Sequence, residues 1–372
     1  MRVRKLDTTD KADQKAFIDL PYRLYRNHPY WVPPLKNDLR FAMDRERYPF
    51  YEHSTADFFV AEQDGQVVGR VCVAENRNYN AYKDCKVAYY YYFDCVEDQA
   101  AAEALFEAAF DWARKRGLEV LRGPKGLVHA DGLGMLVEGF ERQPGSGIAY
   151  NYPYYVDMME KLGFAPWADY LSGYLHHSYE LPERVFELAE RVKERRGLRV
   201  VAYDNKEEMR QWIPRLREIY NRSFVDVPGF CPLTEAEINL IAERILSVAR
   251  PELIKLVMKD ENLVGFLFAY PNVNEGLRKA KGRMWPLGWL HLLRAFRRTK
   301  TVDLNGIGML PKYQGVGGTA VLYVEIEATV RSFDFKHANF IQIYEHNLKS
   351  LGDAQKLGVE WVQRHRIWER KL

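Results

Sequence analysis

A short stretch rich in small residues, Gln314-Gly315-Val316-Gly317-Gly318-Thr319, carries the clearest chemical signal in the sequence. Glycine has no Cβ, so these residues let the backbone approach a ligand closely. Leu322, Ile326 and Val330 follow at helical spacing, which predicts that the stretch opens a helix. The first N–H groups of a helix have no partners within it, and the helix dipole is positive at that end. The stretch therefore predicts a phosphate-binding site.

The segment before this loop predicts a strand with one irregularity. Val302 and Leu304 alternate with polar neighbours, the alternation slips at Asn305-Gly306, and Ile307 and Met309 resume it in the shifted register. A slip of one residue at a glycine inside a strand is typical of a β-bulge. The positioning elements are thus a bulged strand, a glycine turn and a helix.

Two familiar phosphate motifs fit this stretch poorly. A P-loop is excluded because no Lys-Ser/Thr follows the glycines. The Rossmann fingerprint is met only loosely, as Gly315-x-Gly317-x-x-Ala320. That fingerprint opens a βαβ unit, whereas a predicted β-hairpin precedes the loop here.

The bulged strand, the Gln-Gly-x-Gly turn and the helix together resemble the GNAT acyltransferase superfamily. In that family the glycine loop binds the coenzyme A pyrophosphate, and the bulge splays two strands to admit the pantetheine arm. Gln314 and Gly317 match the family's Arg/Gln-x-x-Gly-x-Gly/Ala pattern, whereas Thr319 departs from it at the last position. The resemblance implies that acetyl-CoA or another acyl-CoA is a substrate. The residues it assigns to coenzyme binding are Met309, Leu310, Gln314, Gly315, Val316, Gly317, Gly318, Thr319, Ala320 and Asn347.

Acyl transfer to an amine needs a base, because the amine must lose a proton before it attacks the thioester. Candidates near predicted strand ends are Glu345, Asp303 and His346, and we place Glu345 first. The alternatives are that Asp303 faces solvent and that Glu345 caps the Asn347 turn. Backbone N–H groups near Met309 and Leu310 are expected to polarise the thioester carbonyl.

One catalytic residue of the family is missing. In many GNAT enzymes a Tyr seven residues after the Asn of an Asn-x-x-Ala motif serves as general acid to the leaving thiolate. Counting from Asn347, that position is Ala354. The chain also contains an earlier repeat of this region, described below, and its corresponding residue is Met158 or Met159. This role is therefore not carried over to either copy.

Composition limits the class of protein. A length of 372 residues predicts two domains, and an apolar share of 47% supplies packed cores. No run of 18 apolar residues exists, and the N-terminus lacks the apolar core of a signal peptide. Four cysteines without CxxC spacing fit reduced thiols in a cytoplasmic protein, and the absence of HExxH predicts no metal site.

Several landmarks recur at an offset of about 196 residues. The pairs are Asp64 and Asp260, Gly69 and Gly265, Asp7 and Asp204, and the tetrapeptides Lys161–Phe164 and Lys356–Val359. They indicate duplication of one unit. We expect an α+β fold with two GNAT-like domains, each a mostly antiparallel central sheet with a bulged, splayed strand pair and flanking helices. The predicted boundaries are 1–180, a linker helix at 181–197, and 198–372.

The two copies differ at the chemistry. Where the second has its glycine loop, the first has Val96-Glu97-Asp98-Gln99. Carboxylates at a helix N-terminus are good capping groups but would repel a pyrophosphate. We expect that only the second copy binds coenzyme A.

Each copy also carries an unusual segment. Residues 122–155 are glycine-rich and aromatic, which favours a substrate role or an ordered cover over the first copy. Residues 278–300 hold eight basic residues among Trp and Leu, with no acid between Glu275 and Asp303. Such a segment fits a membrane surface, an acyl chain or RNA, or else it packs on its own domain.

The sequence thus predicts an acyl-CoA-dependent N-acyltransferase, with N-acetyl transfer favoured, acting on a small-molecule or peptide amine. Transfer of longer acyl or aminoacyl groups is one alternative. A catalytically inactive protein that binds coenzyme A or another ligand is the other. We expect a monomer or weak dimer.

Overall fold

The computed structural model describes residues 1–128, 131–176, 178, 180–201, 203, 205–225, 227–314 and 317–372. Gly315 and Val316 of the predicted phosphate loop, and the repeat landmark Asp204, lie outside these described residues. The chain divides into two compact units. Unit 1 comprises Met1–Tyr170, Asn274–Arg294 and Gln363–Leu372, and unit 2 comprises Leu171–Val273 and Ala295–Val362.

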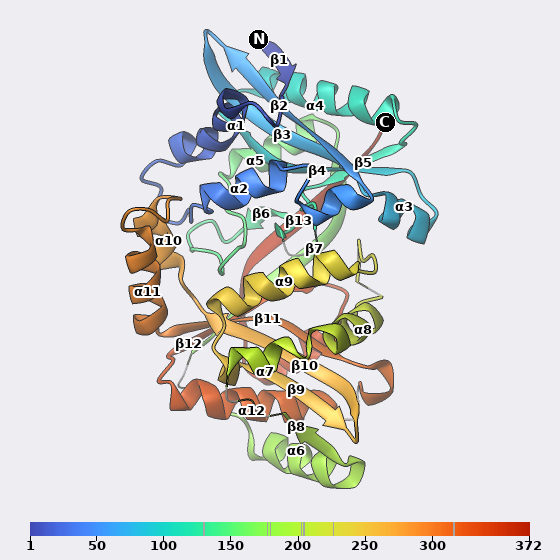
Figure 1. Ribbon diagram of the computed structural model, residues 1–372, viewed down its shortest axis with the longest axis vertical. Helices are drawn as coiled ribbons and strands as arrows, with labels where there is room; N and C mark the ends of the chain where they lie inside the picture. The colour runs from blue at the N-terminus through green and yellow to red at the C-terminus, as the bar shows by residue number, and fades with distance from the viewer. Residues whose placement is uncertain are drawn as a thin grey trace. The chain divides into compact units, whose positions relative to one another are not determined.

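Unit 1 is a mixed sheet with helices on both faces (Figure 1). Its strands follow the order β1-β2-β3-β4-β5-β13. Phe58 packs on Phe17 of α1, while its neighbour Phe59 lies in the core with α4, because successive strand residues point to opposite faces. The elements are β1 Arg2–Lys5, α1 Lys11–Leu24, α2 Lys36–Met43, η1 Pro49–Glu52, β2 Thr55–Gln63, β3 Gln66–Glu75, α3 Arg77–Lys83, β4 Val87–Cys95, α4 Gln99–Arg114, β5 Val120–Gly123, β6 Met135–Glu138, α5 Tyr154–Lys161, α10 Asn274–Ala280 and most of β13 Glu360–Lys371.

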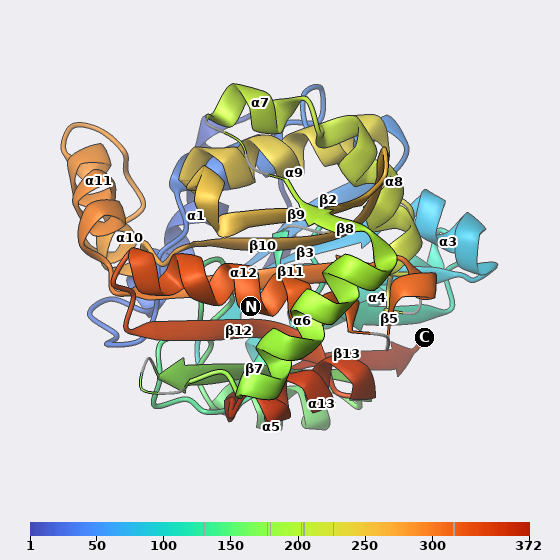
Figure 2. The ribbon, with the colours of Figure 1, turned by 90° about the horizontal axis from the view of Figure 1, so that it is seen from below.

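Unit 2 repeats this plan with strand order β7-β12-β11-β10-β9-β8. Helices α8 and α9 cover one face of its sheet, and α12 and α6 cover the other (Figure 2). The elements are the second half of β7 Ala165–His176, α6 Glu183–Arg196, β8 Leu198–Val200, α7 Lys206–Arg210, α8 Ile213–Ser223, α9 Glu235–Val248, η3 Pro251–Leu253, β9 Ile254–Lys259, β10 Asn262–Pro271, β11 Thr301–Met309, η4 Pro311–Tyr313, α12 Gly318–Ser332, β12 His337–Tyr344 and α13 Leu348–Lys356. Helix α11, Gly288–Arg298, begins in unit 1 and ends in unit 2.

The repeat landmarks have the same structural roles in both copies. Asp64 and Asp260 adopt positive φ at the turns of hairpins β2–β3 and β9–β10. Gly69 pairs with Cys95, and Gly265 pairs with Met309. A Cβ on Gly265 would lie 2.0 Å from Met309 Sδ, and one on Gly69 would lie 3.2 Å from Cys95 Sγ. At Gly69 the nearest atom to such a Cβ is Leu105 Cδ1 of α4, at 2.6 Å, so glycine leaves room for the partner strand's Met309 in one copy and for the α4 side chain in the other.

Each unit contains strand residues that lie outside the corresponding repeat copy in the sequence. Unit 1 contains most of β13, and unit 2 contains the second half of β7. The C-terminal strand β13 pairs with β5 in unit 1, from Trp368↔Gly123 to Lys371↔Val120. Within unit 1, Asp169 of β7 receives two hydrogen bonds from Arg366, at 2.8 and 2.7 Å. The division at 1–180 and 198–372 stays a prediction about the duplicated copies, whereas the packed units are discontinuous.

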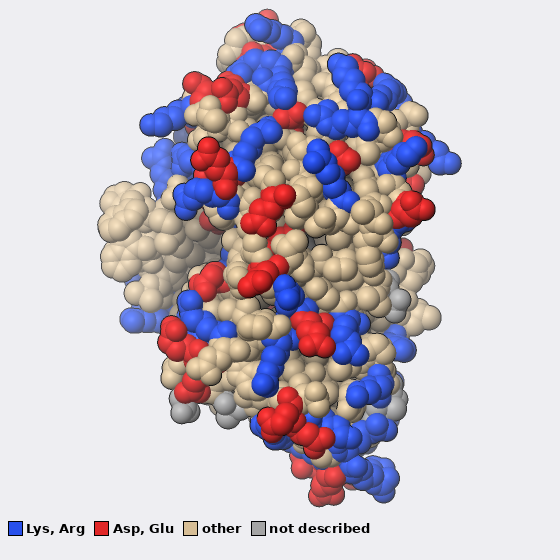
Figure 3. All heavy atoms as spheres, turned by 45° about the vertical axis from the view of Figure 1, so that its right-hand side comes forward, with Lys and Arg blue, Asp and Glu red and all other residues tan. Residues whose placement is uncertain are grey.

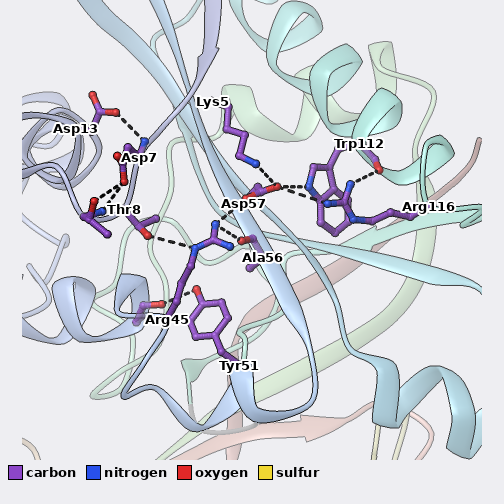
Figure 4. Close-up of polar contacts among 12 residues, drawn as sticks. Lys5, Asp7, Thr8, Asp13, Arg45, Tyr51, Ala56, Asp57, Trp112 and Arg116 are labelled. Carbon is purple, nitrogen blue, oxygen red and sulfur yellow. Dashed lines mark hydrogen bonds and ion pairs between the residues drawn. The ribbon is translucent and has the colours of Figure 1, made fainter.

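One buried carboxylate ties the parts of unit 1 together (Figure 4). The Asp57 side chain is 3% exposed and lies on β2. It contacts Lys5 Nζ at 2.9 Å and Arg45 Nη2 at 2.6 Å, and it accepts from Trp112 Nε1 at 2.7 Å. Although burial opposes ionisation, hydrogen bonds from Lys5, Trp112 and Arg45 lower the pKa of Asp57 below its usual value. The carboxylate thus joins β1, β2, α4 and the segment before η1.

We expect Asp57→Ala to destabilise the protein by about 1–3 kcal/mol, because the buried Trp112 N–H loses its acceptor and Lys5 and Arg45 lose their shared carboxylate. The urea-unfolding midpoint measures this. Glu119→Ala is the matched control, since Glu119 pairs with Lys86 at 2.7 Å while both side chains are more than 60% exposed. That control should cost less than about 1 kcal/mol. Equal shifts for the two variants would contradict the role given to Asp57.

Candidate coenzyme-binding site

The predicted bulge in β11 is confirmed. Phe268 pairs with Gly306 and Ala269 pairs with Leu304, so Asn305 is the extra residue. The Asn305 side chain donates to Tyr270 Oη at 2.7 Å. Parallel pairing between β11 and β12 runs from Thr301↔His337 to Leu304↔Phe340 and stops at the bulge, although β12 continues to Tyr344. The two strands therefore part beyond Leu304.

The loop after β11 turns directly into α12. Gly317 is the N-cap of this helix with φ +88°, a conformation that favours glycine, and no side-chain hydrogen bond caps the helix in the described residues. A Cβ on Gly317 would lie 2.8 Å from Val192 Cγ2 and 3.0 Å from Leu188 Cδ1 of α6. A Cβ on Gly318 would lie 2.6 Å from Met309 Cε. The backbone here is held closely between α6 and β11, with its first N–H groups at a positive helix end.

The structure distinguishes the two backbone donors that the sequence suggests. The Leu310 N–H donates to Val264 O at 2.9 Å, so it is used within the sheet and cannot polarise a thioester carbonyl. The Met309 carbonyl accepts from Gln314 Nε2 at 2.9 Å. In a strand the N–H and C=O of one residue point to the same side. Met309 therefore directs its N–H away from β10, toward the side where β12 parts from β11, and Leu310 is corrected to a structural role.

The other predicted binding residues surround this point. The Gln314 Oε1 lies 3.4 Å from Lys349 Nζ, which places a cation of α13 beside the loop. Thr319 Oγ1 donates to Asp353 Oδ2 at 3.2 Å, so its side chain is directed at α13. The Ala320 N–H donates to Gly317 O at 3.1 Å and is not a free donor. Asn347 caps α13 by accepting from Ser350 N at 3.1 Å.

The three candidate bases differ sharply in exposure. Asp303 is fully buried and accepts hydrogen bonds from Asn272 and from Asn339, the latter at 2.6 Å. The alternative that Asp303 faces solvent is therefore wrong, and its burial before the bulge makes it a weaker candidate base than Glu345. His346 is 72% exposed and Glu345 is 31% exposed, with 3.9 Å between His346 Nε2 and Glu345 Oε1. Glu345 alone combines partial burial with a position at the end of β12.

The position of the missing general acid is filled by core packing. Ala354 is fully buried, in a cluster with Tyr323 of α12 and Phe340 of β12. Burial raises the pKa of Tyr323 above its ordinary value, and the Asp353 charge raises it further. The cluster packs Tyr323 of α12 with Ala354 of α13.

The first copy keeps the fold of the site but fills it with its own groups. Its strand β4 has an extra residue near Tyr92, and its parallel pairing with β5 ends at Tyr89↔Arg122. Asp98 caps α4 by accepting from Ala100 N at 2.9 Å and Ala101 N at 3.3 Å. An internal carboxylate thus occupies the place where the second copy has an uncapped glycine.

The strand position equivalent to Met309 is also occupied in the first copy. Cys95 is the counterpart, because each residue pairs with the repeated glycine of its copy. The buried Tyr155 hydroxyl accepts from Cys95 N at 2.8 Å and donates to Cys95 O at 3.1 Å. Tyr154 donates to the same carbonyl at 2.7 Å. Both tyrosines belong to residues 122–155 and to the start of α5. Their contacts support the interpretation of residues 122–155 as an ordered cover over the first copy.

A buried ion pair lies beside these tyrosines and was not predicted. Arg70 Nε donates to Asp94 Oδ2 at 2.8 Å, and Arg70 Nη1 donates to Phe17 O at 2.9 Å. Burial raises the pKa of Asp94, although the Arg70 charge opposes this shift. A charged pair at matching positions on adjacent strands was the only sequence signal available for it.

The comparisons with known proteins agree with this geometry. The profile of the Acetyltransferase (GNAT) family matches residues 23–123, which lie in the first copy. The solved structure of a tandem GNAT protein from the clavulanic acid biosynthesis pathway aligns with 100% of this chain and 98% of its own, with a TM-score of 0.56 at 12% identity. The GNAT family match in the first copy and the tandem GNAT fold over the whole chain support the predicted superfamily and duplication. Both the predicted family and the mixed α/β fold class are confirmed.

Two relatives match the tandem GNAT chain along nearly its whole length. Protein YghO of Escherichia coli is 26% identical over 371 residues, which cover 98% of this chain and 94% of that protein. The bacterial ceramide synthase of Caulobacter vibrioides is 27% identical over 371 residues, covering 97% of this chain and 95% of that protein. The match to the family model, by contrast, falls only on the copy without the glycine loop.

Lys349 is the residue of the second site that sequence reasoning missed. It follows Asn347 by two residues, and this spacing in the first turn of α13 was its only signal.

No group of His, Cys, Asp and Glu suited to a metal ion occurs in the part of the chain that the structure describes.

Proposed function

We propose that this tandem GNAT protein is an acyl-CoA-dependent N-acyltransferase, and that it joins a long-chain acyl group to a lipid-type amine. The observation that carries the proposal is the contrast between the copies. The α12 N-terminus has a glycine without a capping side chain beside strands that part, whereas Asp98 and Tyr155 fill the same places in the first copy. One coenzyme site per chain follows, in the second copy.

The chemistry assigned to this site is direct transfer. The amine nitrogen attacks the thioester carbon, a C–N bond forms, the C–S bond breaks and coenzyme A leaves as its thiolate. Glu345 accepts the proton that the amine loses, and the Met309 N–H stabilises the carbonyl oxygen as charge develops. No tyrosine acid is required for the step, because a thiolate is a fair leaving group without protonation.

The long chain is proposed from the relative rather than from the fold. A ceramide is an amide of a fatty acid with a long-chain amino alcohol, and the Caulobacter vibrioides protein named for its synthesis matches this chain from end to end. This favours a long acyl donor over the acetyl group that the GNAT pattern alone suggests. A coenzyme-binding protein without turnover is the second candidate, and the buried Ala354 at the acid position favours it.

The test is a donor-by-acceptor panel. The purified chain is incubated with acetyl-CoA or palmitoyl-CoA, each with sphinganine, a short alkyl amine or a peptide amine, and amide products are measured by mass spectrometry. We expect palmitoyl transfer to sphinganine to exceed acetyl transfer by about tenfold or more, the effect of a fitted apolar pocket. Coenzyme binding without any amide would favour the second candidate, and a preference for acetyl-CoA would overturn the long-chain assignment.

A further inference from the structure

The segment between β10 and β11 presents large apolar side chains to solvent. Five of the twelve exposed large hydrophobic residues in the described part of the chain fall within nine positions. They are Trp285 at 78%, Leu287 at 58%, Trp289 at 42%, Leu290 at 42% and Leu293 at 39% exposed. Single exposed apolar residues are ordinary, but a contiguous cluster marks an interaction surface. These five residues are called the apolar patch below.

Helix α11 packs on the protein through its smallest residues. Gly288 and Ala295 are buried and lie seven positions apart, on one face of the helix. A Cβ on Gly288 would lie 1.8 Å from Arg283 O, so the helix start is packed closely. Trp289 and Leu293, four positions apart, share a different face that stays exposed. The alternative that the apolar face packs on its own domain is therefore wrong for these exposed residues.

The charged residues on either side of the apolar patch in the sequence have one sign. No acidic residue occurs from Gly276 to Val302, and Arg283, Arg294, Arg297 and Arg298 are all exposed. Elsewhere the surface is mixed, as Figure 3 shows for one face, where acidic and basic side chains alternate. No helix in the described residues has both the length and the apolar character to cross a bilayer.

We infer that α11 and the preceding loop dock the protein on an anionic lipid bilayer. Tryptophan and leucine enter the interfacial layer, and the arginines meet lipid phosphates and anionic headgroups. A nucleic acid would meet the same cations, but it offers no apolar phase for Leu287, Leu290 and Leu293. The inference rests on this surface and not on the proposed acyltransferase activity, although a lipid amine would reach the protein from such a bilayer.

The test is co-sedimentation of the full chain with vesicles of phosphatidylcholine, with or without 30% phosphatidylglycerol. We expect binding to the anionic vesicles, weakening with salt as exposed charges are screened. Lysine and arginine residues near an anionic surface each favour binding by a similar amount, and the amounts add. Arg294→Ser/Arg297→Ser/Arg298→Ser should therefore lower partitioning onto the vesicles roughly 100-fold. Trp289→Ser/Leu290→Ser/Leu293→Ser should lower it at least tenfold, with a smaller shift of tryptophan fluorescence on vesicle addition.

Matched variants separate docking from general charge and from folding. Arg191→Ser/Arg195→Ser/Arg196→Ser removes three exposed arginines of α6 and should leave binding unchanged, as should Tyr82→Ser. All variants should melt within a few degrees of the parent, since surface changes usually fall within about 0.5 kcal/mol. Equal loss in the α6 variant, binding to a short RNA but not to vesicles, or self-association through the apolar patch would each overturn the inference.

Discussion

Replacing Gly317 with aspartate should abolish coenzyme A binding measured by calorimetry, with the dissociation constant rising at least 100-fold. Two effects add. A side chain at φ +88° is strained and would meet Val192 and Leu188 of α6, and the carboxylate would repel the pyrophosphate at the α12 N-terminus. Gly317→Ala isolates the steric effect and should weaken binding less than the aspartate does.

The matched control for this variant is Gly117→Asp in unit 1. Gly117 has φ +69° but nothing within 4 Å of its would-be Cβ, so the change adds the same strain and charge on open surface. It should leave coenzyme binding intact. In the parent protein the stoichiometry should be one per chain. Binding that survives in Gly317→Asp would place the coenzyme elsewhere, and the first copy would then need re-examination at Asp98.

The second large effect concerns the base. Glu345→Gln keeps the side-chain shape but removes the basicity, so turnover should fall by roughly 100-fold or more, the usual scale for general base catalysis. Coenzyme A affinity should change little, because Glu345 directly follows β12 while the predicted pyrophosphate site lies at the start of α12. Turnover is measured as thiol release on an accepted amine.

Two variants serve as controls for the base. Glu360→Gln changes an exposed glutamate at the start of β13 and should leave turnover unchanged. His346→Gln removes the neighbour of Glu345 and should change turnover only a few-fold. Wild-type turnover in Glu345→Gln would contradict the assignment and leave His346 or water as the base. Asp303 is no longer an equal candidate, because it is buried against Asn272 and Asn339.

Local features of the fold could be predicted because their causes are local. The phase slip at Asn305-Gly306 predicted the bulge in β11, because the periodicity of a strand depends only on neighbouring residues. The glycine at the α12 N-terminus was predicted for the same reason. Its positive φ and its contact with α6 give physical grounds for that residue.

Features that depend on partners distant in sequence were missed. Nothing in the β13 sequence identifies β5, some 240 residues earlier, as its neighbour in the sheet. The hydrogen bond from Cys95 N to the Tyr155 hydroxyl joins residues 60 apart in the sequence, and the contact of Lys349 with Gln314 joins residues 35 apart. The exposure of Trp289 and Leu293 was equally hidden, since an amphipathic pattern does not say what covers the apolar face.

A crystal structure with bound coenzyme A tests the central claim most directly. We predict one coenzyme per chain, with its pyrophosphate at the N–H groups of Gly317–Thr319 and its pantetheine arm along β11 beyond Leu304, within hydrogen-bonding distance of the Met309 N–H. Lys349 should lie near a phosphate. Coenzyme at the α4 N-terminus beside Asp98, or a second molecule in the first copy, would contradict the account.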